Sequence, residues 1–247
     1  DFRPAGLYYY DDGPMRRVFV VNAAGPAVEV YDVLENGDLR HLESFRERRL
    51  TSPNDVVAVG PRSFYVSNDV EAGRDTPVGM LQFLTRAPAG KIFYFDGVSF
   101  RVAADGLRFA NGLALTDDGA ALYAAETSGY ALRRYARDAG TGALTLDKTA
   151  PMPAAPDNIN IAFDGSLWIG AHPKPLALGA VTFGAASVSP SAVIRFNPGA
   201  SDATYTEIFT DDGRKISAAS VAALDRGRLI IGSLLDDKYL ICEFQRR

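Results

Sequence analysis

The sequence has few of the side chains that bind soft metals or form disulfide bridges. Its 247 residues include one cysteine, Cys242, and two histidines, His41 and His172. A single cysteine excludes an internal disulfide, so Cys242 is either a core thiol or half of a bridge to a cysteine outside this chain. A zinc site is disfavoured, because zinc prefers nitrogen and sulfur ligands and only two imidazoles are available.

Long apolar runs, basic clusters and helical periodicity are also lacking. No run approaches the roughly 18 apolar residues that a membrane-spanning helix needs, and the first residues do not resemble a signal peptide. The net charge is −4, and lysine and arginine form no cluster, so a nucleic-acid partner is not expected. The apolar content of 47 % is that of a globular protein with enough material for a core.

Short runs of β-branched and aromatic residues, separated by Gly, Pro and Asp, occur instead along the whole chain. Five of them align as second strands of hairpins, and a third strand follows each. Their anchors are 46, 58, 45 and 62 residues apart, at Val18, Phe64, Leu122, Leu167 and Leu229. A base period of about 45 residues is the length of a four-stranded propeller blade. The sequence therefore predicts an all-β fold, a β-propeller with five visible blades, as a single domain over residues 1–247.

The two longer spacings locate two insertions, at about residues 71–90 and 174–190. Both follow the second strand of their blade, so both are expected as apolar loops on one face, the active-site face. Two interpretations stay open for them. They either form a lid or wall of a substrate cavity or pack on the neighbouring blade.

Amide and carboxylate side chains stand at the start of the first strand in three blades. Asn54, Asn111 and Asp157 precede their second-strand anchors by similar distances, 54 to 64, 111 to 122 and 157 to 167. First strands line the central channel of a propeller, so these side chains are expected to converge. Their oxygens suit Ca²⁺, which takes about six to eight oxygen ligands. The alternative is a role in turns, because Asn and Asp are common turn residues.

Other polar residues have two possible roles each. His41 is expected on an outer strand, at the surface or in packing. His172 follows a second strand on the face with the insertions, and is either a proton shuttle or a loop histidine. Asp69 and Glu126 end second strands and are expected to face solvent.

Several motifs together resemble the paraoxonase (arylesterase/lactonase) family. They are Ser52–Gly60 with Phe64-Tyr65 and Asn68-Asp69, Phe109–Gly112, Asp157–Ile159, Leu167–Pro173, Ser220–Ala223 and Gly227–Gly232. The resemblance runs in order from about Phe2 to Phe244. It implies a six-bladed propeller with two calcium ions in the central tunnel, one catalytic and one structural.

The resemblance also assigns roles by position. The residues that match ligands of the catalytic ion are Asn54, Asn111, Asp157 and Asn158. Those that match ligands of the structural ion are Asp55 and the backbone carbonyl of Leu7. Positions that match the walls of the substrate pocket are Phe109, Ser220 and Leu234. His172 matches a histidine near that pocket.

The sequence departs from the family pattern in three respects. Ala5 and Ala23 stand where the family has its pair of catalytic histidines. A Glu-Asp pair that completes the calcium shells, and the cysteine that pairs with the position of Cys242, lie upstream of this sequence in the family. An N-terminal segment, removed or present as a companion polypeptide, is therefore expected to complete a sixth blade. A self-sufficient five-bladed variant is the alternative.

The function expected from the resemblance is calcium-dependent hydrolysis of lactones or aryl esters. Calcium would act as a Lewis acid on the carbonyl oxygen, and Asp157 would act as base or nucleophile in place of the histidines, or only as a ligand. Alternatives are another reaction in the same pocket, as in strictosidine synthase, or a binding protein that keeps calcium for stability. A protein-interaction propeller of the WD type lacks its signature here. The family resemblance favours a secreted or periplasmic location.

Overall fold

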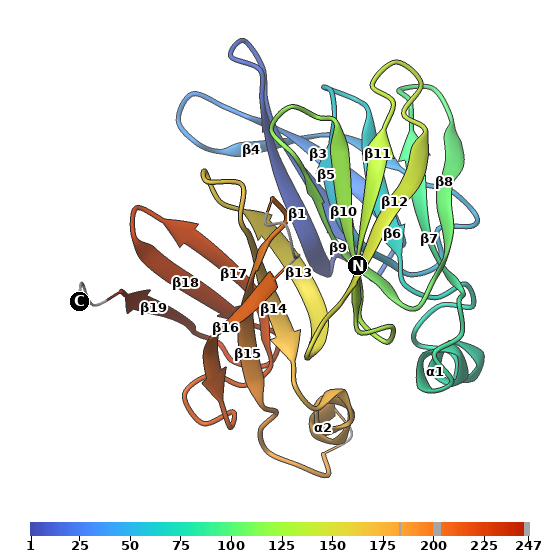
Figure 1. Ribbon diagram of the computed structural model, residues 1–247. Coiled ribbons are helices and arrows are strands. Elements are labelled where there is room, and N and C mark those ends of the chain that lie inside the picture. Colours follow the sequence, from blue (N-terminus) through green and yellow to red (C-terminus); the bar gives the residue numbers. More distant parts are fainter. Residues whose placement is uncertain (183, 200–203, 245–247) are drawn as a thin grey trace. The chain divides into compact units, whose positions relative to one another are not determined.

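The computed structural model describes residues 1–182, 184–199 and 204–244. Across these residues the strands form five antiparallel sheets, and in every sheet the spatial order of the strands follows the chain (Figure 1). The first sheet contains β1 (Pro4–Asp11), β2 (Arg16–Asn22), β3 (Ala27–Val33) and β4 (Leu39–Phe45). The second contains β5 (Pro53–Ala58), β6 (Phe64–Asn68), β7 (Gly90–Phe95) and β8 (Phe100–Leu107).

The other three sheets repeat this meander. The third contains β9 (Ala110–Leu115), β10 (Ala121–Glu126), β11 (Ala131–Arg137) and β12 (Leu144–Pro151). The fourth contains β13 (Ala155–Ile161), β14 (Leu167–His172), β15 (Ser191–Asn197) and β16 (Thr204–Asp211), and the fifth has three strands, β17 (Ala219–Asp225), β18 (Arg228–Ser233) and β19 (Tyr239–Glu243). Four-stranded meanders repeated along one chain are the blades of a β-propeller, and the predicted fold of five blades is confirmed.

The chain divides into two compact units. The first comprises residues 1–124 and 134–147, and the second comprises residues 125–133 and 148–247, so that the boundary runs through the β10–β11 hairpin. In the first unit two cores fill the spaces between sheets, one around Phe19, Phe64 and Phe95 and one around Tyr65 and Leu122. The core of the second unit joins the fourth and fifth sheets.

In the second, third and fourth sheets the second strand is the most deeply buried one, which explains its strong signal in the sequence. Every residue of β6 and of β10 is buried. Strand β1 shows the opposite pattern, in which exposed and partly buried residues alternate, and Tyr8 and Tyr10 pack inward. Continuous apolar runs thus mark strands covered on both faces, whereas alternation marks a half-covered strand.

The two insertions are helical, so the prediction of loops was wrong. Helix α1 (Pro77–Leu84) lies in the first insertion and α2 (Pro175–Thr182) in the second, with residue 183 outside the described part. Thr76 caps α1 by accepting a hydrogen bond from the backbone N–H of Gly79, and Pro77 occupies the first turn. A Thr-Pro pair is a typical helix start. A helix of only eight residues gives little apolar periodicity in the sequence. Among the described residues no helix is long and apolar enough to cross a membrane.

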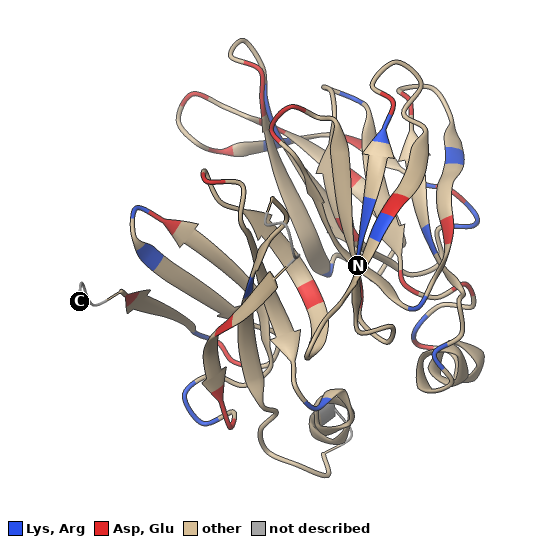
Figure 2. Cartoon of the chain, in the orientation of Figure 1, with Lys and Arg blue, Asp and Glu red and all other residues tan. Residues whose placement is uncertain are grey.

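The expectation that Asp69 and Glu126 face solvent was also wrong. Asp69 is fully buried, and Glu126 is 2 % exposed. Glu126 accepts two hydrogen bonds from the guanidinium of Arg133, at 2.7 and 2.9 Å. The ends of these two second strands are buried, so their carboxylates pair with arginines. Many of the other charged residues lie in connecting loops (Figure 2).

Glu29 on β3 forms a polar cluster with β4. Its carboxylate accepts a hydrogen bond from the Ser44 hydroxyl and lies 2.9 Å from His41 Nε2, which confirms that His41 is on an outer strand. Burial raises the pKa of Glu29, but hydrogen bonds from Ser44, His41 and Asn22 and the charge of Arg46 outweigh it, so that the pKa is lowered overall.

A Glu29→Gln variant should therefore be less stable than the unchanged protein at pH 7. The carboxylate stabilises the fold above its unfolded-state pKa of about 4.3, and this contribution disappears as the pH falls through the lower folded-state pKa. Urea unfolding at pH 7 and at pH 3 measures the difference, with the exposed Glu35→Gln as control. An equal deficit at both pH values would contradict the prediction.

Candidate functional site

A β-bulge interrupts the first strand of four sheets near the strand's start. The pairing register shifts between Pro4 and Leu7 in β1, between Pro53 and Val56 in β5, between Pro156 and Ile159 in β13, and between Ala219 and Val221 in β17. The residues within these shifts include Asn54, Asp55, Asp157, Asn158 and Ser220. A bulge re-aims the side chains it contains. Two of the three positions in the repeat predicted from spacing, Asn54 and Asp157, thus lie on such a bulge, and five predicted site residues lie on bulges.

The last residue of the second strand pairs with the start of the first strand in each of these sheets, and it is polar in all four. These residues are Asn22, Asn68, His172 and Ser233. Asn22 accepts a hydrogen bond from the backbone N–H of Arg3 at 3.1 Å, and Asn68 accepts one from Ser52 at 2.7 Å. The position therefore normally holds the backbone at the strand entrance.

His172 occupies this position but contacts a carboxylate instead. Its Nε2 lies 2.9 Å from Oδ2 of Asp157, and the two residues are 2 % and 7 % exposed. A carboxylate only accepts hydrogen bonds, so Nε2 is the donor. Within the described part of the chain, the buried Nδ1 of His172 has no hydrogen-bond partner. The two predicted catalytic residues are thus in direct contact.

Asn158 is held by the neighbouring strand β17. Its Nδ2 donates to the backbone carbonyl of Ser220 at 3.0 Å, and Nδ2 of Asn160 donates to that of Ala222 at 2.9 Å. Gly170 on β14 lies so close to Ser220 that a Cβ there would be 2.3 Å from the carbonyl carbon. Because Nδ2 of Asn158 is fixed on Ser220, its Oδ1 is directed away from that carbonyl and is available as an acceptor.

In the first unit, Asn54 contacts a buried ion pair. Its Nδ2 donates to Oδ2 of Asp69 at 3.4 Å, and the same oxygen lies 2.6 Å from Nη2 of Arg74. Oδ1 of Asp69 is buried and has no hydrogen-bond partner among the described residues. Burial raises the pKa of Asp69, and the positive charge of Arg74 opposes this rise without cancelling it.

Asp55 is integrated into the backbone of the first unit. Its Oδ1 accepts a hydrogen bond from the N–H of Val56 at 2.9 Å, and its Oδ2 accepts one from Leu113 at 2.7 Å. Gly6 packs directly against Asp55, since a Cβ at Gly6 would lie 2.1 Å from Oδ1. Leu7, whose carbonyl was predicted as a ligand, follows Gly6 on β1, with its side chain exposed. Asn111 is buried on β9.

The predicted pocket-wall residues have different surroundings. Phe109 has a φ of 63°, unusual for a bulky residue, and its ring meets Phe83 of α1 edge-on at 5.0 Å. The first insertion therefore contacts a predicted wall residue. Ser220 is 8 % exposed, whereas Leu234 is 59 % exposed and its N–H donates to Ala218.

The predicted residues divide between the two units. The first unit contains Leu7, Asn54, Asp55, Phe109 and Asn111, and the second contains Asp157, Asn158, His172, Ser220 and Leu234. Sequence reasoning assigned no site role to Asp69 or Arg74. The quoted Asn68-Asp69 motif was the available signal for Asp69, but its burial depends on packing that the sequence does not display.

The donors among these residues in each unit fit a hard cation. They are amide and carboxylate oxygens, and amides must supply much of any such site, since no group of three or more His, Cys, Asp or Glu side chains that could hold a metal ion occurs in the described ranges. Asn54 and Asn158 each use Nδ2 on a protein acceptor, which leaves the amide oxygen for a ligand. Asp69 adds a buried oxygen without a partner. Oxygen-rich, amide-containing sets of this kind suit Ca²⁺.

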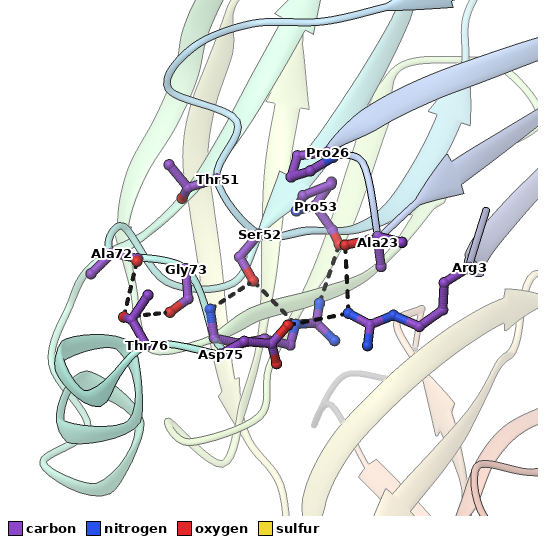
Figure 3. A pocket seen from close by; sticks show the side chains of 12 residues that line it. Arg3, Ala23, Pro26, Thr51, Ser52, Pro53, Ala72, Gly73, Asp75 and Thr76 are labelled. Atoms are coloured by element: carbon purple, nitrogen blue, oxygen red, sulfur yellow. Dashed lines mark hydrogen bonds and ion pairs between the residues drawn. The ribbon is translucent and has the colours of Figure 1, made fainter. Parts of the chain in front are cut away.

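The first unit contains a pocket of about 230 Å³ (Figure 3). Pro53, the residue before Asn54, is one of its lining residues. Its walls come from the start of the first sheet and from the stretch that leads into α1. The lining residues are Arg3, Ala23, Ala24, Pro26, Thr51, Ser52, Pro53, Ala72, Gly73, Arg74, Asp75 and Thr76. Ala23, which stands at a position where the resemblance implies a catalytic histidine, is thus a pocket residue.

Bladed meanders whose first strands carry oxygen donors on bulges define a β-propeller with a polar, oxygen-rich site. The model of the Arylesterase family matches residues 1–244, and the chain belongs to this family. It is 29 % identical over 248 residues to human serum paraoxonase/arylesterase 1, covering 98 % of this chain and 68 % of the relative. It is 31 % identical over 250 residues to serum paraoxonase/arylesterase 2 of Gallus gallus, covering 98 % and 69 %.

Solved structures with much lower identity share the fold. A luciferin-regenerating enzyme superimposes with a TM-score of 0.60 at 14 % identity, covering 96 % of this chain and 73 % of that one. The periplasmic gluconolactonase of Pseudomonas aeruginosa gives 0.60 at 11 % identity, covering 97 % and 65 %. The chain spans about two thirds of the length of its curated relatives.

Proposed function

We infer that this protein hydrolyses carboxylic esters, with lactones and aryl esters as its substrates. The observation that carries the inference is the bulge of β13, where a carboxylate, a contacting imidazole and an amide oxygen donor come from Asp157, His172 and Asn158. Membership of the Arylesterase family supports the ester class, and the names of the relatives and of the gluconolactonase neighbour support the choice of substrates.

We further propose that the protein holds calcium. Asn54, Asn111, Asp157 and Asn158 would bind the catalytic ion, and Asp55 with the carbonyl of Leu7 would bind the structural one. When bound, calcium would supply a Lewis acid that polarises the substrate carbonyl and stabilises the negative charge developing on its oxygen. The oxygen donors described above support this proposal, and the absence of cysteine from both sets of predicted residues fits it.

In the proposed reaction, Asp157 accepts a proton from the attacking water. His172 donates Nε2–H to Oδ2, which orients the carboxylate and leaves Oδ1 as the basic atom. The burial of both side chains keeps bulk water from this contact. The proton passes to the alkoxide or phenoxide oxygen as the acyl–oxygen bond breaks, so that an aryl ester gives a carboxylic acid and a phenol and a lactone gives one hydroxy acid.

A second candidate is a propeller that binds a small molecule without hydrolysing it. The pocket that Pro53 lines favours this alternative, since Ala23 lines it and no histidine does. Ester hydrolysis without the family's histidine pair depends on another base, for which Asp157 is proposed.

Calcium titration with parallel turnover distinguishes the two candidates. Calorimetry measures calcium binding, while hydrolysis of phenyl acetate and δ-valerolactone is followed with and without added calcium. Turnover that appears with calcium and disappears with a chelator is the expected result. Calcium binding without turnover of either substrate would support the binding protein, and turnover insensitive to chelation would contradict the role of the metal.

A further inference from the structure

The pocket that Pro53 lines presents two arginines that have different structural roles. Arg74 is held along one edge of its guanidinium group. Its Nε donates to the Ser52 hydroxyl at 3.1 Å, and its Nη2 donates to the Pro53 carbonyl at 3.2 Å and pairs with Asp69 at 2.6 Å. Nη1 of Arg74 has no hydrogen-bond partner among the described residues. A guanidinium held on one edge is pre-organised, so it loses little entropy when its other edge binds a ligand.

Arg3, the other arginine that lines the pocket, is the more exposed of the two. Its Nη2 lies 3.2 Å from a carboxylate oxygen of Asp75 and 3.5 Å from the carbonyl of Ala23 (Figure 3). The side chains of Arg3 and Asp75 are 57 % and 76 % exposed, respectively. Exposed ion pairs of this kind contribute little to stability, so an incoming group can displace Asp75 at small cost.

The charged residues that line the pocket indicate the chemical class of its ligand. Of the charged residues only Arg3, Arg74 and Asp75 line it, while Asp69 is fully buried behind Arg74. Guanidinium groups donate hydrogen bonds and accept none, and they match the two oxygens of a carboxylate. Asp75 already places a carboxylate on Arg3, so it occupies the position that a ligand carboxylate would take.

We propose that this pocket binds a carboxylate group of the substrate, so that the protein prefers lactones or esters that carry a negative charge. Asp75 is a built-in competitor that leaves Arg3 when the ligand enters. The pocket adjoins Asn54 through Ser52 and Pro53, so a carboxylate held there places the rest of the molecule beside the bulge of β5. This substrate preference rests on the proposed ester hydrolysis, whereas the carboxylate site itself does not.

The site is tested first by binding, which does not depend on turnover. Benzoate and the neutral benzamide are titrated against the full chain by calorimetry. Benzoate should bind and benzamide should not. An Arg3→Gln variant should bind benzoate about fivefold more weakly, the scale of an exposed charge pair. Asp75→Asn should bind it a few-fold more tightly, because the competitor is removed. Arg49→Gln, which removes an exposed charge outside the pocket, should leave binding unchanged.

Arg74 is tested by a variant that keeps its charge. Arg74→Lys retains the pair with Asp69 but loses the planar edge, and benzoate binding should weaken about tenfold. If this variant unfolds, the opposite shifts of Arg3→Gln and Asp75→Asn still decide the question. Equal affinity of the unchanged protein, Arg3→Gln and Asp75→Asn for benzoate would overturn the proposal.

Kinetics then separate this inference from the proposed function. The substrates are 4-acetoxybenzoate and phenyl acetate, which share the ester but differ by a carboxylate. Arg3→Gln should raise KM about fivefold for 4-acetoxybenzoate and leave KM for phenyl acetate unchanged. Benzoate binding that depends on Arg3, without hydrolysis of either ester, would sustain the pocket and refute the hydrolase. Hydrolysis of both esters with equal KM, without benzoate binding, would refute only the pocket.

Discussion

Replacing Asp157 with asparagine should lower ester and lactone turnover by about 10²- to 10⁴-fold, the range typical for loss of a general base. Asparagine has the same shape, and its amide oxygen can still accept a hydrogen bond from Nε2 of His172, so the fold should persist. It loses the negative charge and the ability to accept a proton. Both kcat and the calcium affinity are measured, because a ligand role and a base role affect them differently.

The control is Asp164→Asn, an exposed carboxylate that pairs with Arg195 in the same sheet. This variant should keep full activity. If Asp157→Asn binds calcium normally and turns over within tenfold of the unchanged protein, Asp157 is not the base. If it loses calcium, and excess calcium restores the rate, Asp157 is a ligand only.

His172→Asn is the informative companion, since Asn22 and Asn68 occupy the same position in two other sheets. Asparagine there can hold the strand entrance as those residues do, so this variant should fold and lose activity about tenfold or more. Unchanged activity would mean that His172 only caps the strand. His172→Gln would not allow this comparison, because no glutamine occupies the equivalent position in the other sheets.

Spacing predicted the strands well because the second strands are covered on both faces. The predicted second-strand anchors Leu122 and Leu229 lie in β10 and β18. The polar side chains at the first strands, such as Asn54 and Asp157, were visible because a bulge admits residues that an ordinary buried strand does not. These side chains share a structural position because each lies at the same point in the pairing register of its sheet. A repeated spacing in a single sequence can reveal such a shared position.

Burial at the strand ends could not be predicted in the same way. In the sequence Asp69 looks like a solvated strand end, but Arg74, near the start of the first insertion, pairs with it at 2.6 Å. The helix in that insertion depends on a single Thr-Pro start and on one ring contact, between Phe83 and Phe109. Such long-range pairings leave no periodic pattern. Ala5 and Ala23 could be recognised as departures only by comparison with a family, and the pocket that Ala23 lines could be found only from the fold.

Replacing Gly170 with alanine should destabilise the protein by about 1–3 kcal/mol or more. Gly170 lies on β14 where it faces the bulge of β17, and an added Cβ would be 2.3 Å from the carbonyl carbon of Ser220 and 2.5 Å from the N atom of Val221. These are backbone atoms, so no side chain can rotate out of the way. The fourth and fifth sheets would have to separate, and the core around Trp168 would loosen.

Gly179→Ala in α2 is the matched control, since no atom lies within 4 Å of an added Cβ there. It should be neutral or slightly stabilising, because alanine favours a helix by about 1 kcal/mol over glycine. Urea unfolding measures both variants. Moving Ser220 also moves the carbonyl that holds Nδ2 of Asn158, so Gly170→Ala should lose calcium affinity together with stability. Loss of stability with unchanged calcium affinity would show that Asn158 does not need β17 to orient its amide oxygen.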